Sequence, residues 1–174
     1  MNKLEEINKI MKFKITWKFI KIGYLGYESI QPQITKKDIC DYAYSLLEKS
    51  SSDFDEIAQL IGEKADDYEF NRILEKLAKH ENSNMELQVH KWIIYLTERM
   101  ISNLDNDYFE GLLNITEFWI SLGQPKYAPH IYQGVGNNLM PQEYYNQGMY
   151  DLLKNKHKEW LKEEIQKIRK SEEI

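Results

Sequence analysis

The chain has a single cysteine, Cys40, among its 174 residues. One cysteine cannot form a disulfide within the chain, so a packed core must supply the stability that small secreted proteins take from cross-links. Cys40 follows Ile39 in a segment with helical periodicity, which predicts a buried structural thiol. Scarcity of cysteine is typical of a reducing compartment, and we expect a cytoplasmic protein.

Long apolar runs are also missing. One of the longest clean runs, Trp92–Leu96, has only five residues, whereas a helix needs about 20 to span a bilayer. The first eleven residues mix Lys with Glu and lack the continuous apolar centre of a secretory signal. We therefore expect no membrane association and no secretion.

Constellations typical of catalysis or metal binding do not occur in the sequence. The four histidines are at positions 80, 90, 130 and 157, and no two have the four-residue spacing that places two metal ligands on one helix face. Neither a Gly-x-Ser-x-Gly elbow nor a βαβ unit for a dinucleotide is present. The sequence predicts no enzyme, no cofactor and no metal site, and each histidine is expected to be structural or on the surface.

No segment alternates between apolar and polar residues in the manner of a half-buried strand. Apolar residues instead recur three and four positions apart, as at Ile39, Tyr42, Ala43, Leu46 and Leu47, which is typical of an amphipathic helix. We predict an all-α fold, a compact array of about six to eight helices joined by short polar loops.

The predicted helices form one domain over residues 1–174. Within it, residues 1–15 are expected to be an N-terminal appendage and residues 167–174 a frayed tail. Breaks near residues 51, 65, 83 and 105 favour helical hairpins that stack in a solenoid-like manner.

Capping signals predict where several helices begin. Thr16 is expected to cap a helix that starts at Trp17, and Thr35 with Asp38 resembles a capping box for the next helix. The polar segment 50–53 is expected to end that helix and cap the one after it.

The end of the chain has weaker signals. Prolines and glycines in segment 124–136 predict a turn, with a short helical piece at Tyr127–Tyr132. Pro141 suits the first turn of a single final helix that reaches at least Ile165.

Negative charge is concentrated in the middle of the chain. Residues 38–123 contain 7 Lys and Arg against 18 Asp and Glu, whereas residues 1–37 contain 8 against 3 and residues 124–174 contain 8 against 7. The pI near 5.5 argues against nucleic acid as the main partner. An acidic surface without a reaction centre indicates a basic partner, and an acidic surface that only aids solubility is the alternative.

Two acidic clusters at predicted helix starts are the candidate partner-binding residues. They are Asp66, Asp67, Glu69, Asp105, Asp107 and Glu110. Carboxylates at such positions also stabilise the helix dipole, by about 0.3–1 kcal/mol each. The second cluster is not a calcium loop, because the sixth position is Glu110 in place of glycine and the twelfth is Thr116 in place of glutamate.

Several short motifs occur in an order that is shared with a bacterial family. They are Thr16–Lys18, Gly26–Tyr27, Asp41–Ala43, Leu46–Glu48, Gln124–Pro129 and a final helix with Trp160. This order resembles the family called domain of unknown function 2247, over about residues 12–165. The resemblance implies a small, cytoplasmic, all-helical bacterial protein without assigned catalytic residues. Families of this kind are often encoded beside polymorphic or contact-dependent toxins and are proposed to be immunity proteins.

The leading functional hypothesis is a non-catalytic protein-binding module. It would be an immunity protein whose acidic surface binds and neutralises a cognate bacterial toxin domain of basic character, since opposite charges steer such association. The alternative is a helical scaffold or adaptor protein of a cytoplasmic complex. The sequence leaves the oligomeric state open.

Overall fold

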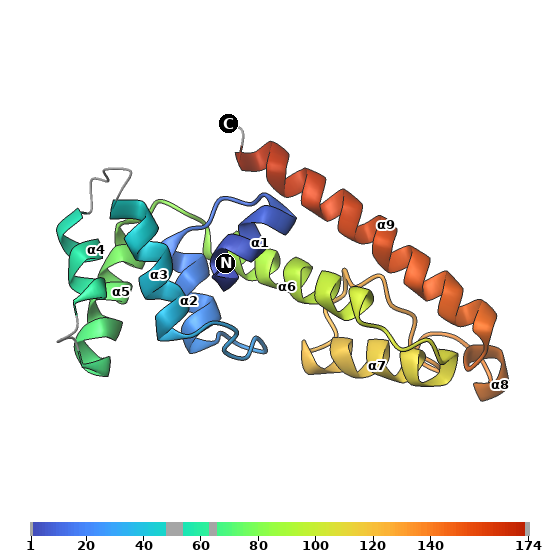
Figure 1. Cartoon of the computed structure of the whole chain (residues 1–174). Coiled ribbons are helices and arrows are strands. Elements are labelled where there is room, and N and C mark those ends of the chain that lie inside the picture. Colours follow the sequence, from blue (N-terminus) through green and yellow to red (C-terminus); the bar gives the residue numbers. More distant parts are fainter. Residues whose placement is uncertain (1, 48–53, 63–65, 173–174) are drawn as a thin grey trace. The chain divides into compact units, whose positions relative to one another are not determined.

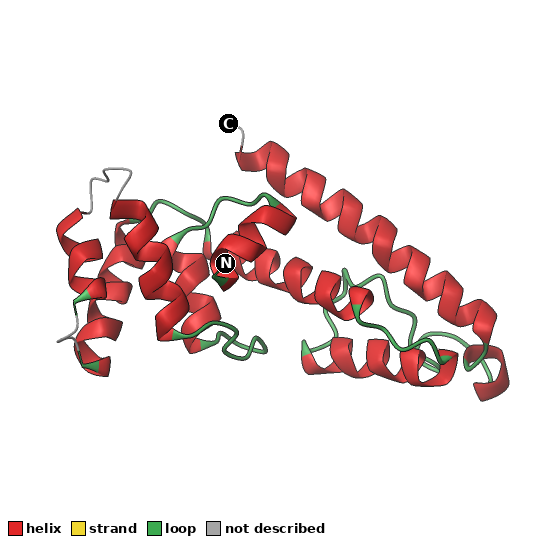
Figure 2. Cartoon of the chain, viewed as in Figure 1, coloured by secondary structure: helices red, strands yellow, loops and turns green. Residues whose placement is uncertain are grey.

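The computed structural model describes residues 2–47, 54–62 and 66–172. Within these ranges the regular structure is helical, and the strand-like pairing is limited to one isolated bridge between Tyr27 and Ile30 (Figure 2). The prediction of an all-α fold is confirmed. The described residues form nine helices, eight of which have at least eight residues.

The helices are labelled in chain order in Figure 1. They are α1 (Lys3–Met11), α2 (Trp17–Leu25), α3 (Lys36–Leu47), α4 (Phe54–Ile61), α5 (Asp67–His80), α6 (Met85–Ser102), α7 (Tyr108–Ser121), α8 (Pro141–Tyr144) and α9 (Gln147–Glu172). The chain divides into two compact units, residues 1–93 and 94–174, here called the N-terminal and C-terminal units. Each unit is described by itself, and the predictions of one domain and of solenoid-like stacking stay predictions.

The first five helices pack on one another in the N-terminal unit. α3 packs on α4 and α4 on α5, while α2 packs on α5 and α1 on α3 (Figure 1). The stacked rings of Phe19 and Trp92, with centroids 4.3 Å apart, anchor the start of α6 to α2. The indole N–H of Trp92 also donates to the Phe19 carbonyl at 2.7 Å. A side chain at Gly23 would overlap the Trp92 ring, so this glycine permits the close approach.

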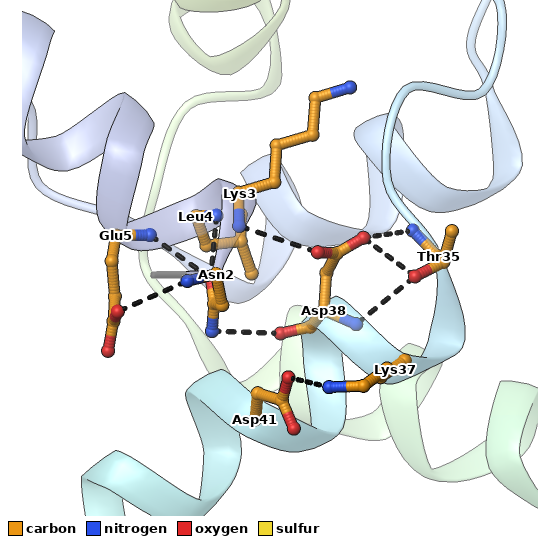
Figure 3. A network of polar contacts seen from close by, with 8 residues as sticks. All are labelled: Asn2, Lys3, Leu4, Glu5, Thr35, Lys37, Asp38 and Asp41. Carbon is orange, nitrogen blue, oxygen red and sulfur yellow. Dashed lines mark hydrogen bonds and ion pairs between the residues drawn. The ribbon is translucent and has the colours of Figure 1, made fainter.

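The N-terminus of α3 carries the predicted capping box. The Asp38 N–H donates to Thr35 Oγ1 at 3.2 Å, and the Thr35 N–H donates back to Asp38 Oδ2 at 2.8 Å. The same carboxylate accepts the Lys3 N–H, and the Asn2 amide donates to the Asp38 carbonyl, which joins α1 to α3 (Figure 3). Partial burial works to raise the pKa of Asp38, but the hydrogen bonds from Thr35 and Lys3 outweigh it and lower that pKa.

Cys40 departs in part from the expected buried thiol. Cys40 is only partly buried, and its Sγ donates to the Leu60 carbonyl at 3.4 Å across the contact between α3 and α4. Desolvation there raises the pKa of the thiol. The side chain therefore serves packing between two helices, as a structural cysteine does.

The C-terminal unit is built around the contact of α7 with α9. Apolar residues of α7, Leu112, Ile115 and Trp119, are fully buried, and so is Leu153 of α9. The ring of Trp119 meets that of Trp160 edge-on, with centroids 5.8 Å apart. Buried apolar residues of α7 and α9 thus form one core.

Two predictions for the end of the chain are wrong. Residues 127–132 form no helix, because Pro129 lacks an N–H and disfavours helical geometry at the residue before it. The final helix is divided into α8 and α9, and Asn146 lies between them. The Asn146 side chain accepts the Met149 N–H at 2.9 Å, which starts a new helix at this point.

Other predicted boundaries have mixed outcomes. Thr16 accepts the Phe19 N–H at 3.1 Å and caps α2 as expected. The breaks near residues 83 and 105 separate α5 from α6 and α6 from α7. The predicted breaks near 51 and 65 and the cap at 50–53 lie outside the described residues. α9 continues through residues 167–172, within the segment for which a frayed tail is predicted.

None of the helices in the described ranges is both long and apolar enough to cross a bilayer.

Candidate protein-binding site

The first predicted acidic cluster lies at the start of α5, in the N-terminal unit. Asp66 is the N-cap, and its Oδ1 accepts the Glu69 N–H at 2.8 Å. Asp67 forms an ion pair with Lys36 at 3.4 Å. Glu69 accepts two hydrogen bonds from the Arg72 guanidinium, at 2.6 and 2.8 Å, which lower the pKa of its carboxyl group. Two of the three negative charges are therefore offset within the chain.

The second predicted cluster lies at the start of α7, in the C-terminal unit. Asp107 is the N-cap and accepts the N–H groups of Phe109 and Glu110 at 2.9 and 3.1 Å. Asp105 Oδ1 accepts the Asp107 N–H at 2.9 Å. These partners are backbone groups without formal charge. Among the described residues, no lysine or arginine forms an ion pair with Asp105, Asp107 or Glu110.

The two clusters thus differ in the charge that they leave available. Each triplet is brought together by its own helix start, and the two triplets belong to different units. Asp66 and Asp107 are N-caps, so both have a structural role at the start of a helix whether or not they contact a partner. A role in partner binding stays a prediction for all six residues.

Exposed aromatic side chains surround the start of α7. Tyr108 is 38% exposed and Phe109 is 44% exposed. The ring of Phe109 contacts that of Tyr145 at a tilt of 48°, with centroids 5.0 Å apart. We call this region the α7-start surface, and it consists of Asp105, Asp107, Tyr108, Phe109, Glu110 and Tyr145.

The α7-start surface is fixed to α9. The Tyr150 hydroxyl donates to the Asp105 carbonyl at 2.6 Å. Gly111 lies against the Tyr150 ring, and a Cβ at this position would overlap that ring. In Figure 1 the start of α7, α8 and the first turns of α9 meet at one end of the C-terminal unit. This anchoring presents the carboxylates and rings on a rigid support, which reduces the entropy lost on binding.

A buried histidine in the same unit was not singled out from the sequence. His157 is fully buried on α9. Its Nε2 accepts the Trp119 indole N–H at 2.7 Å, and its Nδ1–H donates to the Leu153 carbonyl at 2.6 Å. Burial, which outweighs the bond to Leu153, lowers the pKa of His157 to about 4. The sequence does contain a signal for its burial, because positions 150, 153, 157 and 161 have the three- and four-residue spacing of one buried helix face.

His130 lies beside this group, with its ring centroid 6.0 Å from that of His157. Its Nε2 is 3.1 Å from Thr116 Oγ1 and 3.4 Å from the Tyr144 hydroxyl. Burial, and then repulsion from His157 and Lys156, lowers the pKa of His130 to about 3. No periodic pattern marks His130, because it lies in an irregular segment. The pair of neutral imidazoles holds that segment against α7 and α8.

A cavity of about 240 Å³ lies in the N-terminal unit. It is lined by Lys14, Thr16, Glu81, Asn82 and Ser83. The Glu81 carboxylate accepts the N–H groups of Trp17 and Lys18 at 2.8 and 3.1 Å. The Lys18 ammonium donates to the carbonyls of Glu81 and Ser83. Glu81 thus takes the place at the α2 N-terminus that a bound anion takes in anion-binding proteins.

Within the described ranges, no group of three or more His, Cys, Asp or Glu side chains is arranged to hold a metal ion.

Comparison with known protein families matches residues 6–165 of the chain to a family model. The matching model is that of domain of unknown function 2247, described as an uncharacterized protein conserved in bacteria. The chain belongs to this family. The match confirms the resemblance seen in the short motifs. It includes residues of both units and all of the α7-start surface. Searches of curated proteins and of solved structures found no match.

Proposed function

We propose that this member of the domain of unknown function 2247 family is a non-catalytic protein-binding module. It acts as an immunity protein in the bacterial cytoplasm, where it binds a cognate toxin domain of basic character and blocks its activity. One observation carries the proposal. The α7-start surface combines three carboxylates that have no cationic partner among the described residues with two exposed aromatic side chains.

The two kinds of side chain have separate roles in this proposal. Carboxylates steer a basic partner toward the surface and mainly raise the association rate. Aromatic side chains supply contact area with little loss of conformational entropy and are enriched among the residues that dominate binding energy. A surface that only aids solubility requires the charges and not the exposed rings.

The α5 cluster has a weaker claim to the same role. Lys36 and Arg72 already offset two of its charges, so a partner would have to displace or tolerate both cations. Tyr68, which is 78% exposed, is the feature of this helix start that still favours contact with a protein. The α5 cluster therefore remains a secondary candidate.

The blocking mechanism is steric and electrostatic. An acidic protein that covers the basic surface of a nuclease competes with the phosphate groups of the substrate for the same lysines and arginines. Neutralisation of this kind requires no reacting group in the immunity protein.

Co-expression with the product of the adjacent gene tests the proposal. We expect a stoichiometric complex and loss of toxin activity when the complex forms. If the adjacent product binds but has no toxic activity, the scaffold or adaptor function is favoured instead. If it is toxic and does not bind, the immunity function is wrong.

A further inference from the structure

The irregular segment 124–140 joins α7 to α8 and lies against α7 and α9 in the C-terminal unit. We propose that this segment is a strap that opens while α7 and α9 stay packed together, and that acidification opens it by charging His130. The inference is independent of the proposed function, because it concerns a movement within the C-terminal unit and not what the unit binds. Opening would uncover the sides of α7 and α9 on which the strap lies.

Packing anchors the strap weakly. In segment 124–140, all of which the structure describes, no residue is fully buried, whereas Leu122 and Tyr144 on either side of it are. The segment has neither helix nor strand (Figure 2). It has short-range backbone hydrogen bonds, such as the one that the Ala128 N–H donates at 2.9 Å to the carbonyl three residues earlier. Few buried contacts and local hydrogen bonding are the properties of a segment that opens by itself.

Aromatic side chains connect the strap to the neighbouring helices. His130 Nε2 lies 3.1 Å from Thr116 Oγ1 of α7 and 3.4 Å from the Tyr144 hydroxyl of α8. The Tyr127 ring is parallel to the Trp160 ring of α9, with centroids 6.4 Å apart, which is near the outer limit for an aromatic pair. His130 is therefore the polar anchor of the strap, and Tyr127 adds a loose apolar contact.

The closed strap buries two polar atoms without satisfying them. His130 Nδ1 and the Tyr132 hydroxyl are buried, and neither has a hydrogen-bond partner among the described residues. The rings of His130 and Tyr132 meet edge-on, with centroids 4.5 Å apart, so both atoms belong to the same part of the strap. A buried polar atom without a partner is costly, because water would bond to it in the open state. This cost favours opening at any pH.

A positive charge on His130 opposes the closed strap. His157 and Lys156 of α9 both repel such a charge. The hydroxyls of Tyr132 in the strap and Tyr144 in α8 have raised pKa values, so they stay neutral, and α7 contributes a threonine hydroxyl that does not ionise. Burial, followed by the two repulsions, lowers the pKa of His130 to about 3.

Opening returns the imidazole of His130 to water, where its pKa has the ordinary value of 6.5. The closed state is therefore favoured most above pH 6.5, and it loses stability as the pH falls from 6.5 toward 3. With these two pKa values, the ratio of open to closed strap, here called the opening constant, rises about 25-fold between pH 7 and pH 5.

Hydrogen exchange of the full chain, followed by NMR, tests the inference. Opening constants are measured at pH 7 and pH 5 for the Ala128 amide of the strap and the Leu153 amide of α9, after correction for the intrinsic exchange rate at each pH. The Ala128 constant is expected to exceed the Leu153 constant at both pH values, because the strap opens without the core. It should rise about 25-fold at pH 5.

Three variants separate the contributions of the two buried side chains. His130→Gln keeps a group that can bond to the neighbouring hydroxyls and does not titrate, so the rise at Ala128 should be lost. His80→Gln, at an exposed histidine of α5, is the matched control and should retain the rise. Tyr132→Phe removes an unsatisfied hydroxyl and should lower the Ala128 constant about fivefold or more at both pH values.

Several outcomes would overturn the inference. Equal opening constants at Ala128 and Leu153 would mean that the segment opens only when the whole unit unfolds. An Ala128 amide without protection at pH 7 would mean that the segment is not closed. A rise below about threefold, or one that survives in His130→Gln, would show that charging His130 does not open the strap. Co-expression with the adjacent gene product decides the proposed function separately from each of these results.

Discussion

The starts of α5 and α7 look alike in sequence and differ in chemistry. Each has an aspartate N-cap, an aromatic residue in the first turn and a glutamate at the third helical position. At α5, cations from α3 and from the helix itself offset two charges. At α7, Asp105 and Asp107 accept hydrogen bonds from backbone N–H groups, and no lysine or arginine among the described residues pairs with Asp105, Asp107 or Glu110. Acidic composition therefore does not measure available charge, which depends on the cations that the fold brings near.

The largest expected difference between the two units is in how much stability each loses when the pH falls. Folding holds the pKa values of His130 and His157 near 3 and 4, below the ordinary 6.5. The unfolded chain takes up protons below pH 6.5 and the folded chain does not, so stability falls as the pH drops from 6.5 toward 4. At pH 5 each histidine costs the C-terminal unit about 2 kcal/mol.

Urea unfolding at pH 7 and pH 5, followed by amide signals from each unit, measures this difference. The N-terminal unit has carboxyl groups with lowered pKa values, such as those of Asp38 and Glu75, so its own loss is expected only at more acidic pH. His157→Gln should reduce the pH dependence of the C-terminal unit, and His80→Gln, on the surface of α5, should not. Equal stability of the C-terminal unit at the two pH values would contradict the prediction.

Gly111→Ala is expected to disturb the support of the α7-start surface. The added methyl group overlaps the Tyr150 ring, and overpacking of this kind costs about 1–3 kcal/mol. Thermal unfolding should show a loss of this size. Gly62→Ala is the matched control, since its new methyl group meets only ordinary contacts, and its effect should stay within about 0.5 kcal/mol. A neutral Gly111→Ala would mean that Tyr150 can move away without cost.

Removal of charge at α7 should weaken partner binding more than the same change at α5. The variant Asp105→Asn, Asp107→Asn, Glu110→Gln keeps the N-cap, because asparagine caps as well as aspartate. It is expected to lower the affinity for the toxin partner about tenfold, with most of the loss in the association rate.

The matched variant Asp66→Asn, Asp67→Asn, Glu69→Gln should change the same affinity by about twofold or less, because two of its charges are already paired. Surface plasmon resonance at low and moderate salt gives both rates. If the two triple variants lose affinity equally, paired and unpaired carboxylates contribute alike and the comparison between the clusters does not hold.

The smallest effect is expected from opening the α5 cluster. Lys36→Met retains the length of the side chain and removes the cation that pairs with Asp67. Stability should fall by about 0.5 kcal/mol or less, as for most surface ion pairs. Urea unfolding of wild type and Lys36→Met measures this loss. A loss well above about 1 kcal/mol would show that the Lys36–Asp67 pair contributes more than an ordinary surface ion pair.

Local signals were the ones that could be read from the sequence. The Thr35–Asp38 box and the Thr16 cap involve residues three positions apart, so the chain order alone places their atoms together. The division between α8 and α9 was missed because the Asn146 cap competes with a continuous apolar pattern.

Distant pairings could not be predicted in the same way. Lys36 and Asp67 are 31 residues apart, and their contact depends on how α3 and α5 are placed by α4. His130 and His157 meet only because an irregular segment returns to α9. The six candidate residues were therefore identifiable as acidic helix starts, while the charge that each retains was not.

The contact of Gly111 with Tyr150 has a consequence for how relatives of this chain can vary. One position supplies a ring and the other supplies the space for it, so neither can change size alone without loss. We expect the two positions to co-vary across the family, with a larger residue at 111 only where 150 is smaller. Such paired exchange would identify, from sequences alone, the members in which the start of α7 lies on α9 as it does in this chain.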